Sequence, residues 1–537
     1  MNNPRMLGLL KIIPTTYCQL LGVRLKRGLL QATGKESLLL FFILVSAILL
    51  RLYGLGFRDF NVDEAYSFIL ARDYSFGYVL SPMSPLNLVD RHPTLHYALC
   101  WVWLRTAYPL LQEIGLSMEV SFRSMATLFS VGSVLIAIYC GRKVAGGTGA
   151  IMAGLFMAFS SMSISLAQDA RMYSMFELSG GCFLGSILHC QSENRLRNTS
   201  IVMLISSSWF LLLSHHVGII FVLSGWVLLF IAHANWRGQL VIAAIVLTGI
   251  YAYWGIGFIA QLGREQTSGL IFSRGLIVPF TYFTFFAGET LVSIKDWLDL
   301  VPAAPWIVVS FFAITIGLLG SWNIGRQYPI GDRANTQATA WLAFIPILVM
   351  LLMSFYIHKL FLLVRYASAA IIPFVVLIAA GLVVWFHYRF TKIIGLCAIV
   401  AFITLNMAGL CNMYMLKLKP STPWKAVSYY MDEVKPAAVA IYSGNMRLPL
   451  SLYYSGAPLI ELPEQRIVSW EELVRIKPEL DRPDSDIVLM LSHPRQYQDQ
   501  YLRLFSDSGA LQPMKSGFFD VELWLRRSAG RTQWRAR

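Results

Sequence analysis

Long apolar runs separated by short polar segments make up most of the chain as far as residue 412. A helix needs about 20 largely apolar residues to cross a bilayer, so this pattern predicts about eleven membrane-spanning helices, with twelve or thirteen as the alternative. The predicted spans lie near residues 37–56, 121–140, 146–166, 174–190, 199–213, 217–234, 239–259, 304–322, 339–357, 367–386 and 393–412. The expected fold class is therefore an all-α polytopic membrane protein.

The stretch 93–111 fits a helix lying at the membrane interface as well as a span, because Pro93, His96 and Arg105 interrupt it. If it does not cross, basic residues gather in the loops on the side of the N-terminus. These loops contain Arg142, Lys143, Arg195, Arg197, Arg237, Arg326, Arg333, Arg389 and Lys392. Since cytoplasmic loops are enriched in Lys and Arg, we expect a multi-pass cell-membrane protein with a cytoplasmic N-terminus and an extracytoplasmic C-terminus.

This topology divides the chain into a cytoplasmic segment (1–36), a transmembrane domain (37–412) and an extracytoplasmic domain (413–537). Two external loops of the transmembrane domain are long, at 57–120 and 260–303. In the last domain, short apolar runs alternate with helix-like stretches, which is typical of a small α/β domain. The runs are Val439–Tyr442, Asp486–Leu491 and Val521–Leu525.

Composition supports the membrane assignment. The 537 residues are 56% hydrophobic and 14% charged, and the mean hydropathy is +0.57. Soluble domains carry about 25% charged residues, so disorder, a fibrous repeat and an ordinary cytosolic enzyme are excluded. The net charge of +14 fits the loop asymmetry, so it indicates topology and not a nucleic-acid partner.

The first external loop is acidic directly after the first span, where it reads Arg58-Asp59-Phe60-Asn61-Val62-Asp63-Glu64. One interpretation is an acidic loop that serves topology alone. The other is chemical: Asp63 is a candidate general base with Glu64 beside it, and these two carboxylates are the only candidates for a divalent metal site. No cofactor is required by this interpretation, and a metal is left open.

Several external cations face the same side of the membrane. His92 precedes a predicted helix, Arg171 and Tyr173 lie between two spans, and Lys359 stands with Arg365 and Tyr366 in a short loop. Each has a structural alternative: a surface histidine, pairing of Arg171 with Asp169 or Glu177, and side chains that reach to the interface. The functional interpretation is a phosphate site, because guanidinium groups bind phosphate with two parallel hydrogen bonds.

Taken with their order along the spans, these motifs resemble the GT-C glycosyltransferases of the protein O-mannosyltransferase and lipid A aminoarabinose transferase type. The resemblance covers about residues 37–390. The residues that carry it are Asp63-Glu64-Ala65, His92-Pro93-Thr94-Leu95-His96-Tyr97, Arg123, Gly141-Arg142-Lys143, Gly146-Gly147, Gln168, Arg171-Met172-Tyr173 and Arg365-Tyr366. Two differences stand out: Arg91 and His92 replace an acidic residue and a lysine of many relatives, and the Trp-Trp-Asp motif of oligosaccharyltransferases is absent.

The resemblance implies an inverting transferase that uses an undecaprenyl- or dolichyl-phosphate-linked sugar at the external face, with Asp63 as base. Arg171, Tyr173, Arg365 and Tyr366 would lie near the donor phosphate. The acceptor would be a protein, a glycolipid or a polysaccharide. Two other functions remain open: a transporter or flippase for a lipid-linked sugar, and a non-catalytic subunit of a cell-envelope assembly complex.

Overall fold

The computed structural model describes most of the chain and separates it into two compact units. The described residues are 34–84, 92–193, 195–262, 277–292, 306, 309–317, 320, 333–354, 364–387, 391–418, 424–442, 446–482, 485–492, 497–514 and 521–527. The first unit comprises Met1–Gly54, Ser75–Ile114 and Ser121–Tyr414, and the second comprises Leu55–Tyr74, Gly115–Val120 and Met415–Arg537. Lys359, most of the segment 1–36 and much of the loop 260–303 lie outside the described residues.

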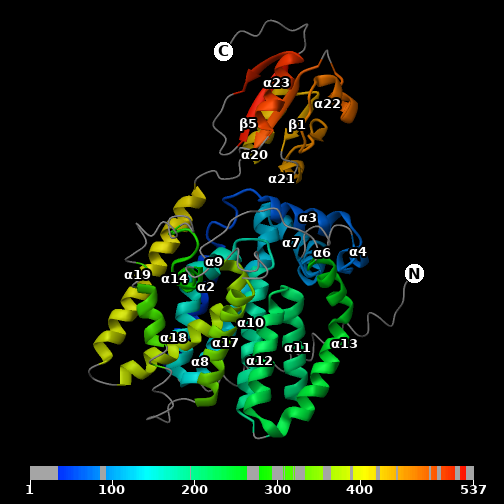
Figure 1. The fold of residues 1–537 in the computed structure, drawn as a ribbon. Helices are drawn as coiled ribbons and strands as arrows, with labels where there is room; N and C mark the ends of the chain where they lie inside the picture. Colours follow the sequence, from blue (N-terminus) through cyan, green and yellow to red (C-terminus); the bar gives the residue numbers. More distant parts are fainter. Residues whose placement is uncertain are drawn as a thin grey trace. The chain divides into compact units, whose positions relative to one another are not determined.

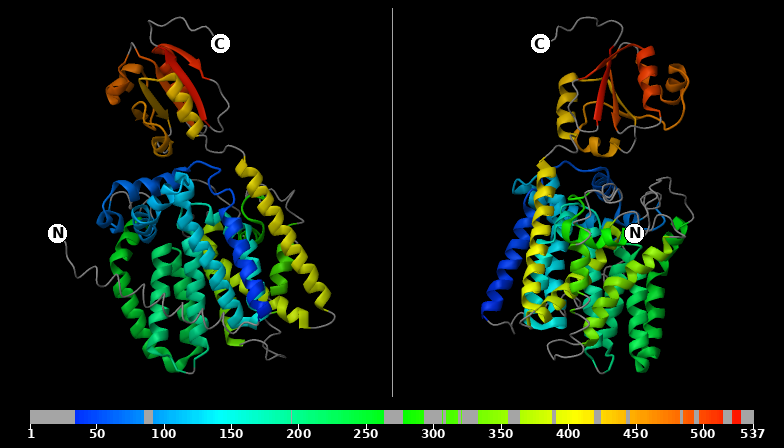
Figure 2. Two further views of the ribbon diagram at one scale, coloured as in Figure 1. Left: turned by 180° about the vertical axis from the view of Figure 1, so that it is seen from behind. Right: turned by 60° about the vertical axis from the view of Figure 1, so that its left-hand side comes forward.

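The first unit is a bundle of long helices around one continuous apolar core (Figure 1). In chain order the helices are α2 (Gly34–Leu52), α4 (Phe76–Leu80), α6 (Leu95–Arg105), α7 (Ala107–Glu113), α8 (Met118–Phe159), α9 (Ser161–Ala167), α10 (Tyr173–Gln191), α11 (Asn198–Ser214), α12 (Gly218–Ala232), η1 (Ala234–Trp236), α13 (Arg237–Leu262), α14 (Ile277–Ala287), α17 (Arg333–Met353), η2 (Val364–Ala370), α18 (Ile371–His387) and α19 (Thr391–Leu418). Helices α10, α11 and α12 pack side by side (Figures 1 and 2).

Five helical stretches among the described residues are long and apolar enough to cross a membrane. They are Met118–Phe159, Ala234–Ile256, Arg333–Met353, Val364–Phe386 and Thr391–Leu416. Helices α11, α12 and α14 are apolar but shorter. This confirms the expected fold class of a polytopic helical membrane protein. The number of spans stays a prediction, because part of the predicted span 304–322 lies outside the described residues.

Helix α8 covers the predicted span 121–140 and most of the predicted span 146–166, joined by a tight reversal, and the end of the second span falls on α9. Ala145 and Gly146 leave the helical conformation, and Gly146 has φ +67°, a value that glycine adopts without strain. A Cβ atom at Gly141 would lie 2.5 Å from the carbonyl oxygen of Gly149. The two halves therefore pack against each other as an antiparallel hairpin, which only glycine at these positions permits.

The ambiguous stretch 93–111 falls on two short helices, α6 and α7, which are separated at Thr106. They have 11 and 7 residues, so each is shorter than the roughly 20 residues that a membrane span requires. The lengths favour the interpretation in which this stretch does not cross.

The second unit is an α/β fold. Its elements are α3 (Val62–Asp73), α20 (Trp424–Val434), β1 (Ala438–Tyr442), α21 (Arg447–Tyr453), β2 (Leu459–Glu461), α22 (Trp470–Ile476), η4 (Pro478–Leu480), β3 (Ile487–Ser492), α23 (Gln498–Asp507), β4 (Ala510–Pro513) and β5 (Val521–Arg527). The strand order is β2-β1-β3-β5-β4, in which β1 pairs in parallel with β2 and β3 while β5 is antiparallel to β3 and β4. The three apolar runs of the sequence form β1, β3 and β5.

Helices cover both faces of this sheet (Figure 2). Successive side chains of a strand point to opposite faces, so Val439 and Ile441 join one apolar cluster with α20, whereas Ala440 and Tyr442 join the other with α22 and α23. Helix α3 packs against α21 in the same unit. The alternation explains why β1 is apolar at every position: both of its faces are buried.

Candidate functional site

Several chain segments bring polar side chains together in the first unit. Arg171 lies in the turn before α10, and Tyr173 is the first residue of that helix. His215 lies where α11 ends, Arg365 lies near the start of η2, and His92 precedes α6. Every one of these residues stands at or next to a helix end, and the N-terminus of α10 adds backbone donors, a setting that favours an anion.

Four aromatic rings form the centre of this region, and we call His92, Tyr173, His215 and Tyr366 the ring cluster. The ring centroid of His215 lies 5.4 Å from that of His92, 5.9 Å from that of Tyr173 and 5.0 Å from that of Tyr366. The Tyr173 and Tyr366 rings stack at 6.2 Å. Residues separated by more than a hundred positions in the sequence therefore share one site.

Two guanidinium groups accompany the ring cluster. The Arg365 guanidinium carbon lies 5.2 Å from the Tyr173 ring centroid, and its Nη1 lies 3.7 Å from Asp169 Oδ2. Arg171 is 2% exposed. Burial lowers the pKa of His92 well below its usual value, and the nearby charge of Arg171 lowers it further. His92 is therefore neutral at physiological pH and contributes a hydrogen-bonding group, not a cation.

The approach of η2 to α10 depends on a glycine. A Cβ atom at Gly180 would lie 2.5 Å from the carbonyl oxygen of Ala369, which is closer than side chains tolerate. Ser368 Oγ also donates a hydrogen bond to the Tyr173 carbonyl oxygen at 3.4 Å. These contacts hold the segment that carries Arg365 and Tyr366 against the start of α10.

Glu177, one of the two acids considered as a partner for Arg171, belongs to a different network. Ser163 Oγ donates a hydrogen bond to Glu177 Oε1 at 2.9 Å, and Arg51 Nη2 donates to the same Ser163 oxygen at 3.0 Å. The pairing of Glu177 with Ser163 and Arg51 was not evident from the sequence, because these residues lie on α10, α9 and α2.

Asp63 and Glu64 lie in the second unit, in the first turn of α3. Helix α3 begins there because Asn61 and Glu64 form a capping box: Glu64 N–H donates to Asn61 Oδ1 at 2.8 Å, and Asn61 N–H donates to Glu64 Oε2 at 3.1 Å. Glu64 is 1% exposed, whereas Asp63 is exposed. The Glu64 carboxylate thus has a structural partner, and Asp63 is the one of the pair that faces outward.

The same geometry bears on the metal that the sequence left open. Glu64 Oε2 accepts the hydrogen bond of the capping box, and no group of three His, Cys, Asp or Glu side chains within the described part of the chain is arranged to hold an ion. Within the described part of the chain, Asp63 and Glu64 therefore do not fit a metal site.

An ionic cluster, in which Glu119 is buried and Lys425 is half-exposed, joins the segments before and after α3 within the second unit. Lys425 Nζ lies 2.7 Å from Glu119 Oε1 and 3.4 Å from Asp59 Oδ1. The Tyr453 hydroxyl donates to Glu119 Oε1 at 2.8 Å and accepts from Phe60 N–H at 2.9 Å. We call Asp59, Glu119, Lys425 and Tyr453 the anchor cluster, because it joins the acidic loop to the C-terminal α/β fold.

The structure therefore groups the predicted site residues in two sets. His92, Arg171, Tyr173, Arg365 and Tyr366 come together in the first unit, and Asp63 and Glu64 share α3 in the second, while Lys359 lies outside the described residues. His215 is not among the predicted site residues, because a pair of histidines at the end of a span is weaker evidence than the other motifs. The signal was present as the His215-His216 doublet at the end of an apolar run, but only packing brings His215 to Arg171.

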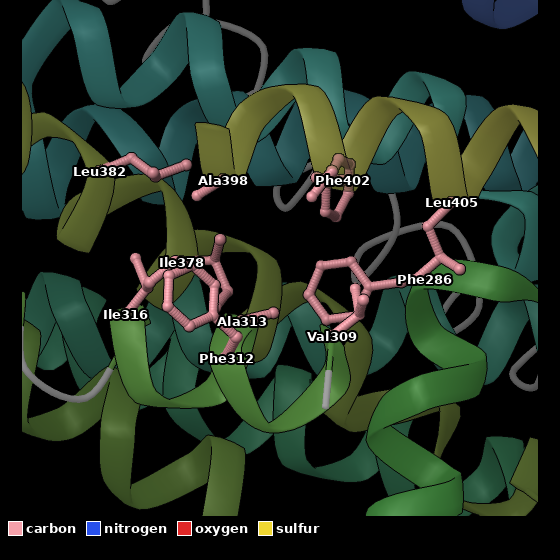
Figure 3. Close-up of a pocket in the computed structure, with 11 residues that line it drawn as sticks. Phe286, Val309, Phe312, Ala313, Ile316, Ile378, Leu382, Ala398, Phe402 and Leu405 are labelled. Carbon is pink, nitrogen blue, oxygen red and sulfur yellow. The ribbon is translucent and has the colours of Figure 1, made fainter. Parts of the chain in front are cut away.

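An apolar pocket lies elsewhere in the first unit, with a lining drawn from α14, α18, α19 and residues 309–317 (Figure 3). Its lining includes Phe286, Phe312, Ile378 and Phe402, and every lining residue is apolar. Such a lining does not suit a sugar or a phosphate.

No family model matches the sequence. The search of curated proteins also finds no significant match. Solved structures do match. The archaeal oligosaccharyltransferase from Archaeoglobus fulgidus in its apo form aligns with a TM-score of 0.52 and 11% identity, over 85% of this chain and 69% of that chain. The archaeal oligosaccharyltransferase AglB, also from Archaeoglobus fulgidus, in complex with an inhibitory peptide and a dolichol-phosphate gives a TM-score of 0.51 at 11% identity, over 85% of this chain and 69% of that chain.

The protein has the GT-C fold. This confirms, at the level of fold, the resemblance that the short motifs suggested. ArnT from Cupriavidus metallidurans bound to undecaprenyl phosphate also aligns, with 14% identity over 91% of this chain and 98% of that chain, at a TM-score of 0.48.

Proposed function

We propose that the protein is a membrane glycosyltransferase that moves a sugar from an undecaprenyl- or dolichyl-phosphate donor to an acceptor protein, glycolipid or polysaccharide. The observation that carries the proposal is the meeting of Arg171 and Arg365 with the ring cluster at helix ends of the GT-C bundle. The site is proposed to open to the extracytoplasmic side of the cell membrane.

The phosphate is the part of the donor that these residues suit. Arg171 and Arg365 supply guanidinium groups, which bind phosphate oxygens through paired N–H donors. Tyr173 and Tyr366 supply aromatic faces beside them. The GT-C fold supports this assignment, because AglB of the same fold has been solved with a dolichol-phosphate.

Asp63 is the proposed general base. As the acceptor hydroxyl oxygen bonds to the sugar C1 atom, the bond from C1 to the phosphate oxygen breaks and the acceptor proton passes to the Asp63 carboxylate. The leaving polyprenyl phosphate is anionic, and Arg171 and Arg365 stabilise its charge. A single displacement of this kind inverts the configuration at C1. The exposure of Asp63 at the start of α3 leaves its carboxylate accessible to an acceptor.

The substitution Asp63→Asn tests this role in the full-length protein. We expect the rate of transfer from undecaprenyl-phosphate sugars to fall by about 100- to 10,000-fold, the usual contribution of general-base catalysis. The measurement is sugar transfer or hydrolysis in proteoliposomes, with a panel of donor sugars. The matched control is Asp73→Asn at the other end of the same helix, where the carboxylate pairs with Arg72 at 2.6 Å on the surface.

The outcomes separate the candidate functions. Near-normal turnover by the Asp63→Asn variant would remove Asp63 as the base while leaving the transferase proposal intact. A wild-type protein that is inactive with every donor would instead favour a non-catalytic subunit, and net movement of intact donor across the bilayer would favour a flippase.

A further inference from the structure

His215 is a buried polar residue that the proposed mechanism has not used. It connects α11 to α12 and is 4% exposed. The backbone N–H of Val217 donates a hydrogen bond to His215 Nδ1 at 3.2 Å. Besides the ring cluster, the ring of Phe176 lies 5.0 Å from the His215 ring. The imidazole is therefore held in one orientation by a backbone bond and by four aromatic neighbours.

The backbone bond fixes the tautomer of this ring. A neutral imidazole carries one N–H and one acceptor nitrogen, and Nδ1 is the acceptor because it receives the Val217 N–H. The proton must then reside on Nε2. Burial, His216 and Arg171 lower the pKa of His215 to about 3, so the ring is neutral at physiological pH and Nε2 is its donor.

This donor lacks an acceptor within the described ranges. His215 Nε2 is buried, and no atom of the described residues accepts a hydrogen bond from it. Buried donors in proteins are almost always paired, because an unmade hydrogen bond leaves the full cost of desolvation. Nδ1 of His92, whose ring lies 5.4 Å away, is likewise buried without a partner among these residues. His215 Nε2 and His92 Nδ1 thus lie in neighbouring rings without hydrogen-bond partners among the described residues, which indicates a ligand.

We propose that His215 binds the donor substrate by donating a hydrogen bond from Nε2 to a phosphate oxygen of the polyprenyl-phosphate headgroup. The inference rests on the proposed function and adds a substrate-binding residue to it. Phosphate is favoured over a sugar hydroxyl because Arg171 and Arg365 belong to the same site. A neutral N–H also adds a donor beside Arg171 without the repulsion that a third cation would bring.

Three substitutions separate the hydrogen bond from the packing of the ring. His215→Phe keeps an aromatic ring among its neighbours and removes the donor. A glutamine amide nitrogen reaches about as far as Nε2, so His215→Gln retains a donor there. An asparagine amide reaches only the Nδ1 position, so His215→Asn keeps polarity without the donor. Thermal unfolding of each variant shows whether it folds, and the Gln and Asn pair remains informative if the Phe variant does not.

The experiment measures equilibrium binding of undecaprenyl phosphate to the full-length protein in nanodiscs. Undecaprenol, which lacks the phosphate, and inorganic phosphate as a competitor are the two comparison ligands. We expect the Phe and Asn variants to bind undecaprenyl phosphate about 10- to 100-fold more weakly, as for loss of a hydrogen bond to a charged group. The Gln variant should remain within about threefold of wild type, and undecaprenol binding should not change in any variant.

His233→Phe is the matched control, because His233 lies at the opposite end of α12 from His215, where it stacks on Trp236 at 3.6 Å and hydrogen-bonds with Gln191. If inorganic phosphate competes with undecaprenyl phosphate for the wild type but not for the Phe variant, His215 recognises the phosphate group itself. Wild-type affinity in the Phe variant, or equal weakening by Phe and Gln, overturns the inference but not the transferase proposal. A wild-type protein that binds undecaprenyl phosphate no better than undecaprenol overturns both.

Discussion

Arg51 shows how a single residue places a charge inside the apolar bundle. It is fully buried near the end of α2, and each of its five N–H groups donates a hydrogen bond. The acceptors are Ala47 O, Ser130 Oγ, Met157 O, Ala158 O and Ser163 Oγ. Only a guanidinium has five donors in a fixed plane, so Arg51 ties α2 to both halves of the α8 hairpin and to α9.

At this residue the conservative substitution is expected to be damaging. Arg51→Lys retains the charge but has three donors, so carbonyl and hydroxyl oxygens in the bundle lose their partners. We expect a loss of stability of at least about 2 kcal/mol, measured as a lower midpoint of thermal unfolding in detergent. Arg72→Lys, at an exposed arginine, should change stability by less than about 0.5 kcal/mol. Equal midpoints for the two variants would contradict the role given to the Arg51 hydrogen bonds.

At the scale of elements, the anchor cluster makes α3 part of the C-terminal α/β fold. Its two carboxylates respond differently to the shared Lys425. Burial raises the pKa of Asp59 more than Lys425 lowers it. Burial also acts to raise the pKa of Glu119, but hydrogen bonds from Lys425, its own backbone and Tyr453 outweigh it, and the pKa falls below 4.5. Glu119 is thus the carboxylate that stabilises the cluster in its charged form.

These opposite shifts predict opposite acid responses. The contribution of Glu119 to stability is present above its unfolded pKa of 4.5 and is lost as the pH falls through its lower folded pKa. The Glu119→Gln variant lacks this contribution, so its stability should decrease less with falling pH than that of the wild type. Folded Asp59 binds its proton more readily than the unfolded chain does, so folding gains from Asp59 as the pH falls toward 3.8. The Asp59→Asn variant lacks that gain, so its stability should decrease more with falling pH than that of the wild type.

Unfolding midpoints of the full-length variants between about pH 3 and about pH 8 measure both slopes. At neutral pH, Glu119→Gln should destabilise the protein by about 1–2 kcal/mol, and more than Asp59→Asn does. Identical pH dependence in the two variants would mean that the anchor cluster does not titrate as its contacts indicate.

At the scale of the whole molecule, the alternation of helices assigns the two ends of the bundle. The reversal at Ala145 and Gly146 lies at one end of α8, and the chain then passes through its second half and α9 before reaching Arg171. Near the reversal, Arg142 pairs with Glu36 at the start of α2. Arg142 and Arg171 therefore lie toward opposite ends of the first unit. Under the proposed topology, the turn that carries Arg142 is cytoplasmic and the proposed phosphate site is extracytoplasmic.

Reporter fusions test this orientation. A fusion after Leu418 should be active with a reporter that folds only outside the cytoplasm, because the C-terminal domain is predicted to be extracytoplasmic. A fusion after Gly146 should be active only with a cytoplasmic reporter, since its loop carries Arg142 and Lys143. A cytoplasmic signal after Leu418 would reverse the proposed location of Asp63 and of the phosphate site.

Candidate site residues could be identified from the sequence more readily than the residues that they contact. Asp63, Arg171 and Arg365 stand out because charges beside apolar spans are costly and need a reason. The capping box of α3 is also local, since Asn61 and Glu64 are three positions apart. By contrast, the assignment of Glu177 to Ser163 and Arg51, and of Asp169 to Arg365, depends on which helices become neighbours.

The sequence by itself determined the classes of element: apolar runs long enough for membrane helices, and short buried strands in an α/β tail. These follow from local hydrophobic periodicity, which acts over a few to about 20 residues. Only the tertiary structure decided that His215 joins Arg171 and that α3 folds with the C-terminal strands. Such contacts join residues far apart in the chain, and they depend on how whole helices pack against one another, which no local pattern encodes.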